Sequence, residues 1–279
     1  MFKIIVTTDF SENSKSGILF ALQLASQTSC ELLFYNVIKI TRPLLWTESL
    51  FENYKSLELE RNQKLLQEFV EAISLKANLS NLHFNYKCDI GTNTPRQILA
   101  YAKKTKADYI CIGTRGASKT KQFFGSNTDK LIKTSPIPLF VIPQNYKPKT
   151  ISTIWYASDF EQIATELKTI EKLHPSLNAK VKVIHYDYLL PLNENILKHK
   201  KIIATNKNSA ISFEFKKLDI EYSLAYHLQR DLKKSKPSLL ILFTKQNRTW
   251  FEKIFLASKT IEMTFDSKTP ILIFKKHHK

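Results

Sequence analysis

The strongest constraint on this 279-residue chain is an internal repeat. Thr7-Thr8-Asp9-Phe10, which follows the first apolar run, recurs as Ala157-Ser158-Asp159-Phe160. The run Lys106–Thr114 recurs as Lys236–Thr244, and the landmarks keep the same order in both copies. Self-similarity at a fixed spacing indicates duplication of a structural unit. The sequence therefore predicts two related domains, residues 1–146 and 150–279, with a boundary near Pro148.

Each copy alternates β-branched strand patterns with amphipathic helix patterns. In the first copy we expect strands at 2–6, 31–38, 83–88, 109–112 and 138–142, with helices between them. The helix over 50–77 is expected to turn Leu57, Leu65, Phe69 and Ile73 to one side. Strands that alternate with helices form parallel sheets covered on both faces. The expected fold is α/β, with two tandem five-stranded parallel sheets, and ligands in such folds bind at the carboxyl ends of the strands.

The net charge of +17 first suggests a nucleic-acid binder. The excess is divided about evenly between the copies, however, and no basic tail carries it. A lysine-rich solvated surface is the simpler interpretation, and binding that scarcely weakens with salt would exclude nucleic acid. The three cysteines form no CxxC pair, and the first apolar run is too short for a signal peptide. No apolar stretch is long enough to span a membrane, so we expect a cytoplasmic protein without a membrane partner.

The chemistry of the first copy is concentrated in Gly113-Thr114-Arg115-Gly116 and Gly125-Ser126-Asn127-Thr128. The two runs lie between a predicted buried strand and a helix. Glycine allows positive φ and close backbone approach, and a helix start offers free N–H groups to an anion. The pattern fits a phosphate cradle, to which Lys119 and Lys121 would add charge. It also fits a tight turn followed by a helix cap, and spacing alone leaves both open.

With these motifs, residues 1–146 resemble the universal stress protein family. The resemblance rests on Val6–Ser11, Asn36-Val37, Gly91, Ala107–Gly116, Gly125-Ser126 and Pro136–Pro143. Residues 150–279 look like a second, diverged copy. The resemblance implies a Rossmann-like fold of the adenine nucleotide alpha hydrolase type, in which the last strands of two domains pair. The duplication would make that pairing internal, as a pseudo-dimer within one chain, and a homodimer of chains stays open.

The resemblance also implies an adenosine pocket that holds ATP, with or without Mg. Asp9 and Val37 would contact the base, Thr7 and Thr8 would form the nearby wall, and the glycine runs would hold ribose and phosphates. The implied nucleotide-binding residues are Thr7, Thr8, Asp9, Val37, Ile112, Gly113, Arg115, Gly116, Gly125, Ser126, Asn127 and Thr128.

The sequence departs from the family pattern in two places. The family's ATP-binding members have nine residues between the second and third glycines, whereas eight lie between Gly116 and Gly125. In the second copy, Phe243 replaces Gly113, Asn247 or a neighbour replaces Gly116, and Ala257-Ser258 replaces Gly125-Ser126. We predict that the second copy binds no nucleotide, that Asp159 caps a helix there, and that His185 is a packed core residue.

The resulting hypothesis is a stress-response universal stress protein whose first copy binds an adenine nucleotide and regulates an unidentified protein partner. The alternative is a nucleotide-free scaffold that acts through protein contacts, which the short loop and the degenerate second copy favour. No nucleophile–base pair, metal motif or Walker sequence is present, so we expect neither an enzyme nor a metal site.

Overall fold

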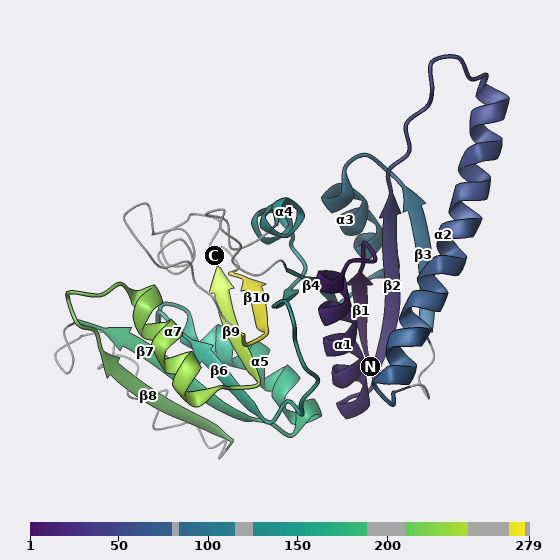
Figure 1. Ribbon diagram of the computed structural model, residues 1–279. Coiled ribbons are helices and arrows are strands. Elements are labelled where there is room, and N and C mark those ends of the chain that lie inside the picture. Colours follow the sequence, from purple (N-terminus) through teal and green to yellow (C-terminus); the bar gives the residue numbers. More distant parts are fainter. Residues whose placement is uncertain (80–83, 115–124, 189–209, 245–267, 277–279) are drawn as a thin grey trace. The chain divides into compact units, whose positions relative to one another are not determined.

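The computed structural model describes residues 1–79, 84–114, 125–188, 210–244 and 268–276. Within these ranges the chain divides into two compact units at Pro148. We call residues 1–148 half one and residues 149–279 half two, and each is described by itself (Figure 1).

Half one is a doubly wound α/β unit. Its strands are β1 (Phe2–Thr7), β2 (Cys30–Ile38), β3 (Phe84–Ile90), β4 (Tyr109–Gly113) and β5 (Leu139–Ile142). Its helices are α1 (Glu12–Gln27), α2 (Glu48–Lys76), α3 (Thr94–Thr105) and α4 (Ser126–Thr134). The strands are parallel in the order β3-β2-β1-β4-β5. The predicted fold class of this half is therefore confirmed.

Two pairs of helices flank this sheet. Helix α1 packs on α2, helix α3 packs on α4, and both pairs contact the strands. The sheet core consists of fully buried aliphatic and aromatic residues such as Ile5, Phe34 and Ile110. Cys88 and Cys111 are also buried, as their apolar strands predicted.

The predicted apolar side of α2 was partly wrong. The helix buries Leu66, Val70 and Ile73, whereas Leu57 and Leu65 are exposed. Figure 1 shows the N-terminal part of α2 extending past the ends of β2 and β3. Leu65 is exposed although Leu66 is fully buried and Gln63 hydrogen-bonds the backbone of β3. Leu65 therefore lies on the side of the helix that faces away from the sheet, which helical spacing alone did not identify.

Half two repeats the same topology within its described residues. The strands β6 (Thr153–Ala157), β7 (Lys180–Asp187), β8 (Ile211–Lys217), β9 (Leu239–Thr244) and β10 (Ile271–Lys275) are parallel, in the order β10-β9-β6-β7-β8. Helices α5 (Ile163–Leu177) and α7 (Leu224–Ser235) connect them. The predicted pairing of β5 with β10 across the halves stays a prediction.

The duplication extends to single hydrogen bonds. Phe10 and Phe160 both adopt positive φ, at 63° and 64°, and each backbone N–H donates to the hydroxyl two residues earlier at 3.0 Å. Asn36 donates to the carbonyl of Thr8 at 2.8 Å, and His185 Nδ1 contacts the carbonyl of Ser158 at 2.9 Å in the same place. His185 is buried beside Phe160, as predicted for a core residue.

No helix in the described part of the chain is both long and apolar enough to cross a membrane.

Candidate functional site

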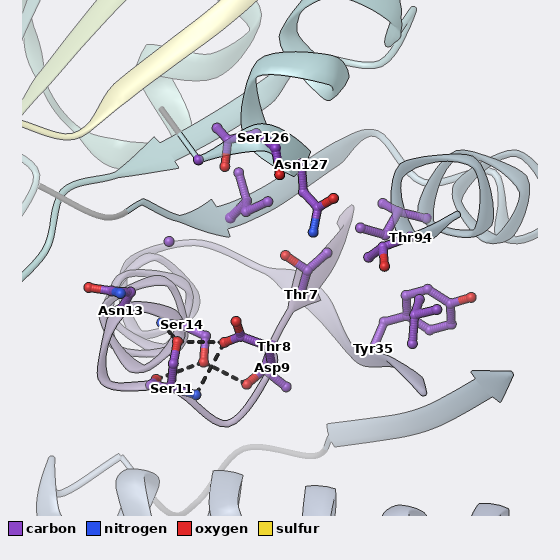
Figure 2. A pocket seen from close by; sticks show the side chains of 16 residues that line it. Thr7, Thr8, Asp9, Ser11, Asn13, Ser14, Tyr35, Thr94, Ser126 and Asn127 are labelled. Carbon is purple, nitrogen blue, oxygen red and sulfur yellow. Dashed lines mark hydrogen bonds between the residues drawn. The ribbon is translucent and has the colours of Figure 1, made fainter. Parts of the chain in front are cut away.

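A pocket lies where the strand order of half one reverses. Strand β1 sits between β2, its successor along the chain, and β4, which is reached only after α3. Adjacent crossovers leave the sheet in opposite directions there, which opens a crevice at the carboxyl ends of the strands. The pocket has a volume of about 200 Å³ and opens between α1, α3 and α4 (Figure 2).

Ten of the twelve predicted site residues line this single pocket. They come from both ends of half one and are Thr7, Thr8, Asp9, Val37, Ile112, Gly113, Gly125, Ser126, Asn127 and Thr128. The other two, Arg115 and Gly116, lie outside the described residues, as do Lys119 and Lys121. The fold thus brings together segments that are more than a hundred residues apart in the sequence.

The turn after β1 is held by its own side chains. Asp9 Oδ1 accepts hydrogen bonds from the backbone N–H of Ser11, at 3.1 Å, and from the Ser11 hydroxyl. Ser11 in turn caps α1 by accepting from the N–H of Ser14. The buried hydroxyls of Thr8 and Ser14 lie 2.8 Å apart. These contacts fix the Asp9 carboxylate at the mouth of the pocket, where Asp9 remains exposed.

The opposite wall is apolar and rigid. Tyr35 stacks on Tyr101 with ring centroids 4.5 Å apart, and its hydroxyl donates to Asp89 at 2.9 Å. Burial, together with the hydrogen bond to Asp89, raises the pKa of Tyr35, so the ring stays neutral. Val37 and Ile98 complete this wall, which has the flat, apolar character that suits an aromatic ligand.

Close packing, and not its backbone conformation, requires glycine at position 113. None of the described glycines has a positive φ. Of the two properties considered for these glycines, Gly113 uses close backbone approach, while Gly116 lies outside the described residues. A Cβ on Gly113 would lie 2.0 Å from the carbonyl oxygen of Asn13 in α1, and one on Gly17 would lie 3.0 Å from the Gly113 nitrogen. Strand β4 and helix α1 therefore approach backbone to backbone, and this contact shapes one side of the pocket.

Of the three helix starts that line the pocket, those of α1, α3 and α4, only that of α4 has no side-chain cap. The first turn of α1 is capped by the Ser11 side chain, whereas α4 begins at Gly125, which has no side chain to cap it. Helix geometry leaves the first N–H groups of α4 without intrahelical partners, and they carry the positive end of the helix dipole. No side chain among the described lining residues is cationic. The start of α4 is therefore the main feature of the described walls that would attract an anion.

Six lining residues were absent from the predicted set. They are Ser11, Asn13, Ser14, Tyr35, Thr94 and Ile98. The first three occupy the cap and first turns of α1, and Thr94 begins α3, so helix-start signals after a strand could have identified them. Tyr35 and Ile98 carried no such signal, because the packing of β2 against α3 alone brings them to the pocket.

The corresponding region of half two differs in the way the sequence predicted. Phe243 has the register position of Gly113, since the former pairs with Phe274 and the latter with Ile142. The Phe243 ring stacks on Phe274 at 4.9 Å and meets Tyr156 edge-on at 5.4 Å. Asn247, Ala257 and Ser258 lie outside the described residues. Half two thus has a packed aromatic side chain at the position where half one has a glycine.

Comparisons with known proteins agree with this architecture. A family model described as the universal stress protein family matches residues 1–143. A universal stress protein from Archaeoglobus fulgidus superposes with a TM-score of 0.70 at 14% identity, covering 98% of each chain. A putative universal stress protein from Pseudomonas aeruginosa gives 0.56 at 14% identity, covering 98% of this chain and 92% of its own. At such identity the likeness shows the fold alone. No curated protein matches significantly.

Proposed function

Because the chain belongs to the universal stress protein family, we propose that half one binds an adenine nucleotide and acts as a nucleotide-responsive regulatory module. The observation that carries the proposal is the pocket at the strand-order reversal. Ten residues selected from the sequence for nucleotide binding, drawn from β1, β2, β4 and α4 and from the turns beside them, line it together.

The chemistry of each wall matches one part of such a ligand. The start of α4 faces the pocket with unpaired N–H groups and would hold phosphate. The Asp9 carboxylate would accept a hydrogen bond from the adenine amino group or a ribose hydroxyl. The wall of Tyr35, Val37 and Ile98 would lie against the base.

The size of the pocket limits what the described walls enclose. Sites that bury a drug-sized ligand usually measure about 300–1,000 Å³, whereas these walls enclose about 200 Å³. They therefore surround part of a nucleotide rather than all of it.

ATP, with Mg²⁺ on its phosphates, is the proposed ligand. Mg²⁺ usually binds proteins through one or two carboxylates together with substrate phosphates. Asp9, the one carboxylate among the described lining residues, is already assigned to the base or ribose, so the ion would be held by the phosphates and by water. The ion would neutralise phosphate charge in a pocket whose described walls carry no cation. We propose no catalytic role for half one.

The test places a negative charge at the start of α4. Asn127→Asp changes an exposed residue in the first turn, where a carboxylate favours the helix dipole but repels phosphate. Mg-ATP at a hundredfold excess over its Kd should stabilise the wild type by about 2.7 kcal/mol in thermal unfolding. In Asn127→Asp the affinity should fall at least about fivefold, since like charges a few ångströms apart cost about 1–4 kcal/mol.

Ser49→Asp is the matched control, because Ser49 is exposed at the same position of the first turn of α2, outside the pocket. It should leave the thermal shift unchanged. An equal loss in both variants would mean that general charge, not the start of α4, governs binding. No stabilisation of the wild type by Mg-ATP would reject the proposal in favour of a nucleotide-free scaffold that acts through protein contacts.

A further inference from the structure

Half two keeps the acidic residue of the half-one pocket but not its exposure. Asp159 follows β6 as Asp9 follows β1, and in both turns the carboxylate Oδ1 accepts from the backbone N–H two residues later at 3.1 Å. Asp9 is exposed to an open pocket, whereas the Asp159 side chain is 15% exposed. A carboxylate that is withdrawn from water needs a counter-charge.

The counter-charge is Lys276, the residue that follows β10. Its Nζ lies 2.7 Å from Oδ1 and 2.5 Å from Oδ2 of Asp159, and its side chain is 3% exposed. Lysine is almost never buried to this degree unless it is paired. The ammonium is thus held by both oxygens of one carboxylate.

Two further carboxylates lie near the ammonium: Glu166, and the half-exposed Glu161, whose Oε2 is 3.9 Å from Nζ. Glu166 Oε1 lies 3.3 Å from Lys276 Nζ, without the angle of a hydrogen bond, so this contact is ionic. The other oxygen of Glu166 accepts from the hydroxyl of Tyr156. Burial raises the pKa of Glu166, although the Tyr156 hydroxyl and Lys276 oppose the shift. Asp159 is therefore the main partner of the ammonium, and Glu166 the weaker one.

We propose that this part of half two is a binding site for a primary ammonium group, and that the chain fills the site itself with Lys276. Asp159, Glu166 and the phenol of Tyr156 form its polar wall, while Phe243 and Phe274 stack close to Tyr156. The site arises because Asp159 occupies in half two the position that Asp9 has in half one. In half one the carboxylate of Asp9 is open to external ligands. In half two Lys276 pairs with the carboxylate of Asp159, so that external ligands cannot bind it.

The first experiment removes the internal ammonium from the full-length protein. Lys276→Ala leaves Asp159 and Glu166 buried without their cation, and breaking a buried pair in this way is strongly destabilising. We expect the Tm to fall by about 5–20 °C. Lys275→Ala is the matched control, because Lys275 is the neighbouring residue on β10 and is only half-buried. It should change the Tm little.

Chemical rescue then distinguishes a site for ammonium from a general packing defect. Propylammonium has the atoms that Lys276→Ala removes beyond Cβ. It should raise the Tm of Lys276→Ala in a concentration-dependent manner and leave the wild type unchanged, whereas neutral 1-propanol should not rescue. An unaltered Tm in Lys276→Ala, no rescue, or equal rescue by 1-propanol would each reject the proposal.

A measurement on the wild type keeps the proposal testable if Lys276→Ala does not fold. Acetylation by a water-soluble anhydride, followed by peptide mass mapping, reports the accessibility of each lysine amine. Lys276 should react at least about tenfold more slowly than Lys275, because its amine is buried and enclosed by its contacts with Asp159. Similar rates at the two lysines would show that the site is not occupied in solution.

Discussion

Gly113 and Gly125 both line the half-one pocket, but the chain needs them for different reasons. A Cβ on Gly113 would meet the Asn13 carbonyl oxygen at 2.0 Å, whereas one on Gly125 would meet nothing within 4 Å. Gly125 has φ of −60° and ψ of 156°, which any residue can adopt. One glycine thus permits helix–strand contact, and the other leaves the pocket and the start of α4 open.

Alanine at each position should separate the two roles. Gly113→Ala forces α1 away from β4, and overpacking of this kind costs about 1–3 kcal/mol. Gly125→Ala should cost no more than about 1 kcal/mol, because alanine is only a poorer cap than glycine. Urea unfolding measures both. Equal losses of stability would contradict the proposed contact between α1 and β4.

The contrast also bears on how the pocket can be tested. A bulky residue at position 113 would abolish nucleotide binding by disturbing α1, whether or not a phosphate lies near Gly113. Substitutions at the start of α4 avoid this ambiguity, because Ser126 and Asn127 are exposed.

At the scale of elements, both halves end a helix in the same strained way. Helix α3 ends at Lys106 with φ of 53°, and α7 ends at Lys236 with φ of 47°. Left-handed backbone costs an ordinary L-residue roughly 1–2 kcal/mol, which is why glycine is common after helices. Both copies nevertheless have lysine at this position. The turn from helix to strand therefore imposes a left-handed backbone that lysine does not favour.

Glycine at these two helix ends should therefore stabilise the protein. Lys106→Gly and Lys236→Gly should each raise the free energy of unfolding by about 0.5–1 kcal/mol, which is the relieved strain less the extra entropy of unfolded glycine. Lys103→Gly, inside α3, is the control and should lower it by up to about 1 kcal/mol. Chemical denaturation gives the sign, and a loss at Lys106→Gly would show that its backbone is not strained.

At the scale of the whole molecule, the two halves share the hydrogen bonds of the turn after the first strand but use its acidic residue differently. The turns after β1 and β6 match in φ and in hydrogen bonds, yet one carboxylate faces an open pocket and the other holds Lys276. All described residues that line the pocket belong to half one. The described walls of the proposed nucleotide pocket therefore all come from that half.

Half one should consequently fold and bind on its own. A fragment of residues 1–148 contains its own five-stranded sheet and core, and a domain of this length usually folds independently. We expect cooperative thermal unfolding by circular dichroism and an affinity for Mg-ATP within about threefold of the full chain. Absence of a cooperative transition, with the full chain folded under the same conditions, would contradict this independence.

Much of this architecture could be predicted from the sequence by local rules. The alternation of apolar strands with helix patterns, and the repeat of Thr7–Phe10 as Ala157–Phe160, predicted the elements and their duplication. Asp9 and the two glycine runs could also be selected, because strand ends and helix starts in a parallel sheet meet at one edge. These features depend on residues that are close to one another in the sequence. Only the resemblance to the family implied the other site residues, which are Thr7, Thr8, Val37 and Ile112.

Only the tertiary structure decided how those residues are used. It showed that Gly113 serves a backbone contact, that Tyr35 and Ile98 reach the pocket, and that α2 buries Leu66 rather than Leu57. It also brought Lys276 to Asp159, 117 residues away, which no spacing rule indicates. These four findings have the same physical reason. Which side chains contact each other depends on how the sheet and the helices pack in three dimensions. The periodicity of a sequence does not contain that information.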